Sequence, residues 1–122
     1  MGWIGVDLDG TLAETDHGAP FNPCYIGPPC PPDELTGISM VDMVKKWLAE
    51  GKDVRVFTAR ACGNEADVLM AIQAWCEKHI GRILPITNQK DYDTIEIYDD
   101  RAVQVGKNTS KIIGYSVYGN HT

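Results

Sequence analysis

Apolar residues along the chain occur in two spacings, as short continuous runs and as stripes that repeat every three or four positions. The continuous runs predict buried strands. They cover residues 3–8, 54–57, 83–86 and 94–98, with a short fifth run over 102–105. The stripes predict two amphipathic helices, over residues 39–50 and 64–81. Strands and helices therefore alternate along most of the chain.

Both predicted helices carry boundary signals. The apolar face of the first consists of Met40, Met43, Val44, Trp47 and Leu48. Gly51 follows it as a stop. Asn64 is the expected N-cap of the second helix, and Gly81 ends it. The apolar stripe of this helix consists of Val68, Leu69, Ile72, Trp75 and Cys76. Cys76 is therefore an expected core residue.

Alternation of strands and helices is typical of a mostly parallel sheet that is covered by helices on both faces. We therefore expect an α/β fold, a three-layer Rossmann-like domain that spans residues 1–122 as a single unit. The tail from residue 106 onwards is expected to dock on the core through its apolar residues, which are Ile112, Ile113, Tyr115, Val117 and Tyr118.

The segment 12–35 holds most of the prolines and shows no clear period, which predicts an ordered loop or small flap. Three of its apolar residues are candidates to shield a site from water, namely Phe21, Tyr25 and Ile26. Cys24 and Cys30 also lie in this segment, and either they close a loop, share a metal or stay reduced.

Composition narrows the class of protein. The chain has 122 residues, of which 43% are hydrophobic and 23% charged, as expected of one folded domain. A net charge of −6 disfavours a broad nucleic-acid surface. No apolar run approaches the ~20 residues that a membrane helix needs. We therefore expect a cytoplasmic protein without a membrane partner.

Polar and charged residues follow three of the predicted strands directly. Asp7 and Asp9 come after the first strand, and alternation along an extended strand end points both side chains to the same side. Thr58 and Arg60 follow the second strand, and Asp99-Asp100 follow the fourth. Because ligands of parallel sheets bind beyond the carboxyl ends of the strands, these residues are expected to meet at one rim. The structural alternatives are an Asx turn at Asp9, a polar strand end and a solvated acidic turn.

In this order, the motifs resemble those of the haloacid dehalogenase (HAD) superfamily of phosphotransferases. Four short motifs carry the resemblance: Val6–Thr11 (VDLDGT), Val56–Arg60 (VFTAR), a lysine before the fourth strand, and Ile97–Asp100 (IYDD). The chain is shorter than many members and leaves no room for a separate cap domain after the second strand. The resemblance therefore implies a capless or minimally capped, phosphatase-like member.

The resemblance implies four catalytic residues. Asp7 matches the nucleophile that forms an aspartyl-phosphate, and Asp9 matches the general acid and base. Thr58 matches the hydroxyl that binds the transferring phosphoryl group. Lys90 lies where the family places the lysine that neutralises the phosphate and the carboxylates. The loops that bind the substrate would include Gly10, Thr11, Ala59 and Arg60, and Arg60 alternatively forms an ion pair with the acidic rim.

The resemblance also implies a Mg2+ site. Its ligands would come from Asp7, the backbone carbonyl of Asp9, and the pair Asp99 and Asp100, with Asp99 as the closer ligand of the pair. Oxygen ligands of this kind are those that Mg2+ prefers.

The function that we expect from these residues is Mg2+-dependent hydrolysis of a phosphomonoester. The substrate is either a small molecule or an exposed phosphate on a macromolecule, and a homo-oligomer would offer a way to cover the open site. One alternative is a catalytically silent binding or regulatory module. The other is a different HAD reaction, either phosphotransfer or dehalogenation.

Overall fold

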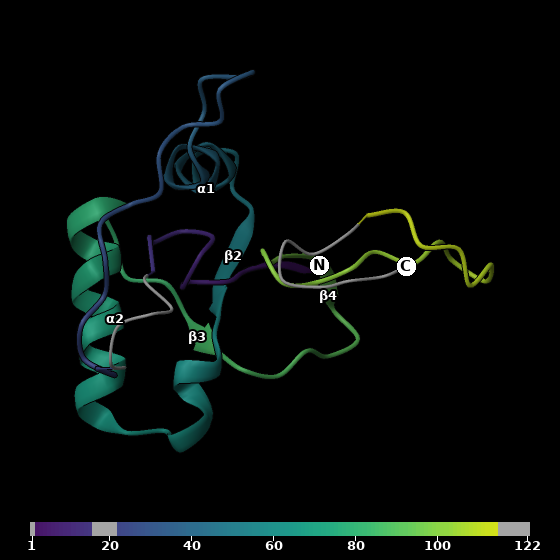
Figure 1. The fold of residues 1–122 in the computed structure, drawn as a ribbon. Coiled ribbons are helices and arrows are strands. Elements are labelled where there is room, and N and C mark those ends of the chain that lie inside the picture. The colour runs from purple at the N-terminus through teal and green to yellow at the C-terminus, as the bar shows by residue number, and fades with distance from the viewer. Residues whose placement is uncertain (1, 16–21, 115–122) are drawn as a thin grey trace.

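The computed structural model describes residues 2–15 and 22–114 and contains an all-parallel sheet (Figure 1). Its strands are β1 (Trp3–Val6), β2 (Asp53–Phe57), β3 (Ile86–Thr87) and β4 (Thr94–Tyr98). They lie in the order β3-β2-β1-β4, so β1, the first strand in the sequence, is central. The prediction of a parallel α/β domain is confirmed, and the carboxyl ends of all four strands point the same way.

Helix α1 (Met40–Ala49) follows the predicted pattern. Its N-terminus has a capping box, in which Ser39 accepts a hydrogen bond from the Asp42 amide and the Asp42 side chain accepts one from the Ser39 amide. Gly51 follows the helix with a φ of +81°, a conformation that glycine adopts readily.

Helix α2 (Ala66–His79) begins later than expected, because a short 3-10 helix, η1 (Ala59–Gly63), precedes it. Asn64 is not the N-cap of α2, and that prediction was wrong. Its φ of 49° is left-handed, and it ends η1 instead. Asparagine tolerates this conformation better than most residues. Glu65 takes the N-cap position of α2 without a side-chain hydrogen bond to the helix.

The core lies on one face of the sheet. The register pairs Ile4 with Val54 and Val6 with Val56, so these four side chains share a face. The buried residues of both helices join the same cluster, which includes Val44 and Trp47 of α1 and Ile72 and Cys76 of α2. Cys76 is fully buried, as predicted.

The opposite face of the sheet is covered by Trp3. The indole lies over Gly5, where a Cβ atom would come within 3.0 Å of the ring. The Arg55 guanidinium stacks on the ring at 4.8 Å from its centroid, and Nε1 donates to Asp91 at 2.9 Å. Over residues 2–15 and 22–114 no helix covers this face, so the expected three-layer Rossmann-like arrangement is not confirmed.

Three predictions near the C-terminal half need correction. The expected strand over 83–86 is only Ile86–Thr87. Residues 102–105 do not form a strand, and Val105 makes only an isolated antiparallel bridge to Ile112. The chain after β4 runs away from the helices (Figure 1), and Ile112 and Ile113 are exposed rather than docked. Tyr115, Val117 and Tyr118 lie outside the described residues.

The proline-rich segment 12–35 is partly built into the domain. Ala13 and the preceding Leu12 are fully buried core residues, not flap residues. Further along, the Trp75 indole Nε1 donates to the Gly27 carbonyl at 2.8 Å. Ile26 packs against the core, whereas Tyr25 is exposed. Phe21 lies outside the described residues. All four cysteines are free thiols in the structure.

None of the described helices is both long enough and apolar enough to cross a membrane.

Candidate functional site

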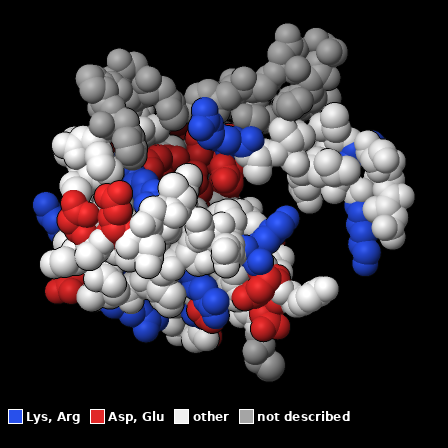
Figure 2. Space-filling model, turned by 90° about the horizontal axis from the view of Figure 1, so that it is seen from below, with Lys and Arg blue, Asp and Glu red and all other residues white. Residues whose placement is uncertain are grey.

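A cavity of about 610 Å3 lies at the carboxyl ends of β1, β2 and β4. Six predicted site residues line it together, namely Asp7, Asp9, Thr58, Ala59, Arg60 and Asp99. Seen from below, the molecule shows one group of acidic side chains in the upper centre with basic side chains beside it, and further acidic side chains at the left and lower right (Figure 2). The strand-end prediction is therefore confirmed in its geometry.

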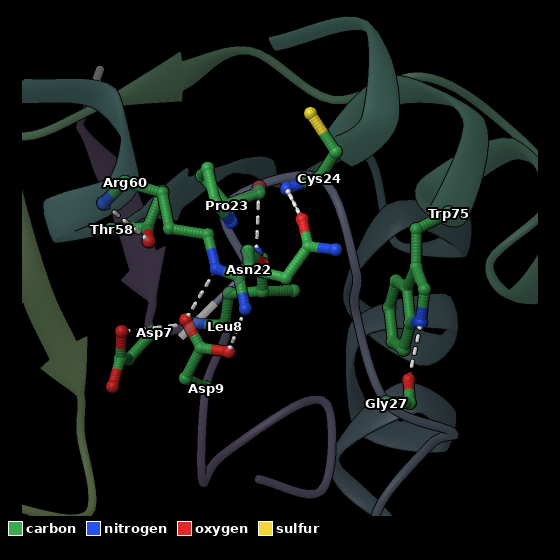
Figure 3. Close-up of polar contacts among 10 residues, drawn as sticks. All are labelled: Asp7, Leu8, Asp9, Asn22, Pro23, Cys24, Gly27, Thr58, Arg60 and Trp75. Carbon is green, nitrogen blue, oxygen red and sulfur yellow. Dashed lines mark hydrogen bonds and ion pairs between the residues drawn. The ribbon is translucent and has the colours of Figure 1, made fainter. Parts of the chain in front are cut away.

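Three carboxylates form a compact cluster at this rim. One oxygen each of Asp7, Asp99 and Asp100 lies within 4.8 Å of the other two. The parallel pairing of β1 with β4 produces this proximity, because the Asp7 amide continues the ladder and donates to the Tyr98 carbonyl at 2.8 Å. Asp7 Oδ1 also accepts a hydrogen bond from the Leu8 amide at 2.9 Å (Figure 3).

The electrostatics of this cluster favour a bound proton or cation. Burial, the charge of Asp99 and contact with the Asp100 carboxyl raise the pKa of Asp7 to about 7, although the Leu8 amide acts in the opposite direction. Like charges held this close destabilise the ionised form of Asp7. A divalent ion would remove that penalty, and hard carboxylate oxygens suit Mg2+.

Asp100 is held in place by the turn that follows β1. The Thr11 hydroxyl donates to Asp100 Oδ1 and accepts from the Asp100 amide, both at 3.1 Å. Gly10 has a φ of +85°, and a Cβ atom there would collide with the Asp100 carboxylate. Gly10 and Thr11 were predicted to bind substrate. In the structure they position Asp100, and neither lines the cavity.

Asp9 lies outside the carboxylate cluster and forms an ion pair with Arg60. Both carboxylate oxygens accept hydrogen bonds from the guanidinium, each at 2.8 Å (Figure 3). Nη1 of Arg60 also donates to the Pro23 carbonyl at 2.8 Å and to the Asn22 carbonyl at 3.4 Å. The Arg60 side chain is only 7% exposed. The ion-pair alternative for Arg60 is therefore the one observed, and it also ties the segment 12–35 to the site.

Thr58 is buried at the end of β2 and has two roles in the structure. Its side-chain oxygen accepts a hydrogen bond from the Arg60 amide at 3.2 Å, which caps η1. Its own amide donates to the Thr87 carbonyl of β3 at 2.9 Å. Thr58 lines the cavity, and its hydroxyl donates no hydrogen bond to the part of the chain that the structure describes, so the structural role does not exclude phosphate binding.

Lys90 is exposed and does not line the cavity, although it lies in the predicted loop. Asn88 of the same loop lines it instead. The cationic residue that sequence reasoning missed is Arg101, which lines the cavity from the turn after β4. Its amide donates to Asp99 Oδ1 at 2.8 Å. Its position directly after the acidic pair at a strand end is the sequence feature that would have indicated Arg101 as a site residue.

Comparisons of the chain with protein-family models, with curated proteins and with solved structures give no match. The resemblance to HAD phosphotransferases therefore rests on the four motifs and on the positions of their residues in the fold.

Proposed function

We propose that this protein is a small, capless HAD-like phosphatase that hydrolyses phosphomonoesters with the help of Mg2+. One observation carries the proposal: Asp7 and Asp99, from two separate strand ends, line one cavity together with Thr58, and Asp100 completes a cluster of three carboxylates with them. Stabilising a folded chain does not require three carboxylates within contact of one another, and their mutual repulsion opposes it.

The carboxylate cluster fits a divalent metal. Asp7 and Asp99 offer oxygens that line the cavity, and Asp100 supports them from the side of Thr11. When bound, Mg2+ would neutralise the carboxylates and the phosphate and hold the phosphate in line with Asp7.

The first chemical step uses Asp7. Its carboxylate oxygen that does not accept from the Leu8 amide attacks phosphorus, and the bond from phosphorus to the ester oxygen breaks. Thr58 donates its hydroxyl hydrogen to a phosphoryl oxygen. The departing oxygen needs a proton, which Asp9 is proposed to supply after it has left Arg60 and taken up a proton from solvent.

Asp9 reaches that role only after its ion pair opens. Both of its oxygens accept hydrogen bonds from Arg60, so neither is placed to donate a proton to a leaving group. A substrate phosphate that attracts the Arg60 guanidinium would release Asp9. In the second step Asp9 removes a proton from water, which attacks phosphorus and frees Asp7 and orthophosphate.

The charge of the phosphate would be met by two arginines, Arg60 and Arg101, both of which line the cavity. Guanidinium groups bind phosphate oxygens in pairs. This assignment replaces the lysine that the HAD pattern supplies, because Lys90 lies outside the cavity.

The engagement of Asp9 favours one second candidate, a catalytically silent module of the same fold. Such a protein would keep Arg60 on Asp9 permanently and would bind phosphate without turnover. Both candidate functions include the same metal site, and they differ only in whether the phosphate ester is hydrolysed.

Release of phosphate from an aryl phosphate tests the proposal. With Mg2+ the wild-type protein should turn over, and Asp7→Asn should reduce kcat by at least about a thousandfold because the nucleophile is lost. The matched control is Asp93→Asn, an exposed carboxylate outside the cavity. Equal rates for Asp7→Asn and wild type would contradict the mechanism, and binding of phosphate without turnover would favour the silent module.

A further inference from the structure

A second hollow adjoins the cavity of the proposed phosphatase site. It has a volume of about 690 Å3 and lies between α2, η1 and the loop after β3. Cys62 and Asn88 line both hollows, so the two lie next to each other. We call this second hollow the amide groove, after four residues that line it: Asn64, Gln73, Asn88 and Gln89.

The amide groove differs sharply in charge from the catalytic cavity. Six charged residues line the catalytic cavity, namely Asp7, Asp9, Arg60, Glu65, Asp99 and Arg101. No charged residue is among those that line the amide groove in the described part of the chain. Its remaining surface is mostly apolar, from Leu69, Leu84 and their neighbours. A ligand that matches it is therefore neutral, with hydrogen-bonding groups and an apolar face.

The side chains of the amide groove are placed by the fold. The left-handed conformation of Asn64 ends η1 and brings its amide to the groove. Gln73 lies on α2 and is half-buried. The loop after β3 is fixed by the Thr87 hydroxyl, which accepts from the Gln89 amide at 3.1 Å. Within residues 2–15 and 22–114 the structure gives the four side-chain amides no hydrogen-bond partner, so their donors and acceptors face solvent or a ligand.

We propose that the amide groove receives the leaving group of the phosphomonoester, and that this group is a neutral ring compound bearing hydroxyls, as in a sugar or a nucleoside. The proposal rests on the proposed phosphatase function. Side-chain amides pair with hydroxyl groups as both donors and acceptors, and the apolar residues cover the less polar face of a ring. The absence of lysine and arginine in the groove disfavours a polyanionic strand of nucleic acid.

Steady-state kinetics with four substrates test this inference: a hexose phosphate, a nucleoside monophosphate, an aryl phosphate and an oligonucleotide with a terminal phosphate. We expect the hexose phosphate or the nucleoside monophosphate to exceed the other two in kcat/KM by at least about tenfold. Comparison of these first two substrates separates a sugar from a nucleoside as the source of the ring.

Two variants probe the groove itself. Gln73→Leu removes an amide at similar size, and Asn64→Gly removes one while keeping a residue that tolerates left-handed backbone. Each variant should raise KM for the preferred substrate, the hexose phosphate or the nucleoside monophosphate. Relative to the aryl phosphate, kcat/KM for that substrate should fall about tenfold, because one hydrogen bond to the substrate is lost. Gln104→Leu, at an exposed position outside both hollows, is the matched control.

The outcomes separate the two proposals. Two results would overturn the assignment of the groove and leave the phosphatase function intact. One is hydrolysis of the aryl phosphate with no preference for the hexose phosphate or the nucleoside monophosphate. The other is an equal loss of kcat/KM on all four substrates in Gln73→Leu. A preference for the oligonucleotide would also overturn it. Failure to hydrolyse any of the four substrates would refute the phosphatase, and the leaving-group assignment with it.

Discussion

Two aspartates that lie two positions apart in the sequence, Asp7 and Asp9, are stabilised by opposite means. Asp9 is matched within the protein, because the Arg60 guanidinium contacts both of its oxygens at 2.8 Å. Asp7 instead faces two further carboxylates, which together with burial raise its pKa to about 7. The fold thus supplies a cation to one aspartate and adds anions to the other.

This difference indicates which part of the site would be stabilised by a bound proton or metal ion. An ion pair that is complete within the chain needs no ligand, whereas a cluster of three carboxylates is stabilised by a proton or a metal ion. We therefore infer that the Asp7 side of the site binds the cation and that the Asp9 side responds to the substrate.

Replacing Arg60 removes the ion-pair partner of Asp9. Of the predicted changes, this one should reduce the stability of the fold most. Arg60→Gln leaves the partly buried Asp9 without its partner and should cost about 2 kcal/mol of unfolding free energy. The double variant Arg60→Gln/Asp9→Asn should recover most of the loss, because no unpaired charge remains. Chemical denaturation of the four proteins measures this coupling, and additive losses would show that the pair is not coupled.

The pH dependence of stability tests the Asp7 side. In metal-free protein the folded-state pKa of Asp7 is about 7 against 3.8 for the ordinary group. The folded state thus binds the proton more tightly, and this stabilisation is complete below pH 3.8 and lost as the pH rises through about 7. Wild type should lose stability relative to Asp7→Asn across this window.

Thermal unfolding in the presence of a chelator, from acidic to neutral pH, provides the measurement. Addition of Mg2+ at neutral pH should restore the stability of wild type and leave Asp7→Asn less affected. Parallel pH curves for the two proteins would show that Asp7 does not titrate as described.

The smallest expected effect distinguishes the two candidate sources of positive charge for the phosphate. Arg101 lines the cavity and Lys90 does not. Arg101→Met should lower kcat/KM about tenfold, whereas Lys90→Met should change it by less than about threefold. The aryl phosphate assay with saturating Mg2+ measures both, and a larger loss in Lys90→Met would restore the assignment that the sequence motif suggests.

The sequence predicted which residues meet at the carboxyl ends of the strands better than which side chains pair with one another there. Asp7, Thr58 and Asp99 follow apolar strands, and parallel pairing necessarily brings such positions to one edge. The pairing of Asp9 with Arg60 was only one of two alternatives, because a side-chain contact across 51 positions depends on the path of η1. Arg101 was missed, since an arginine in a turn is most often solvated.

The layers of the fold were predicted less well for a similar reason. Periodicity identifies the apolar side of a strand or helix but not what covers it. The cover over Gly5 is the ring of Trp3 in the same strand. Alternation places both residues on one face, but it does not indicate that the indole lies over the glycine. The short runs at 83–86 and 102–105 contain too few residues for pattern alone to separate a strand from an extended loop.

The most direct test of the central claim is a titration of the metal-free protein with Mn2+, followed by electron paramagnetic resonance and competed with Mg2+. Wild type should bind one ion per chain that Mg2+ displaces, and Asp99→Asn should weaken binding by at least about tenfold, while Asp93→Asn binds as wild type does. Absence of saturable binding, or equal affinity in wild type and in the double variant Asp7→Asn/Asp99→Asn, would contradict a metal at this cluster.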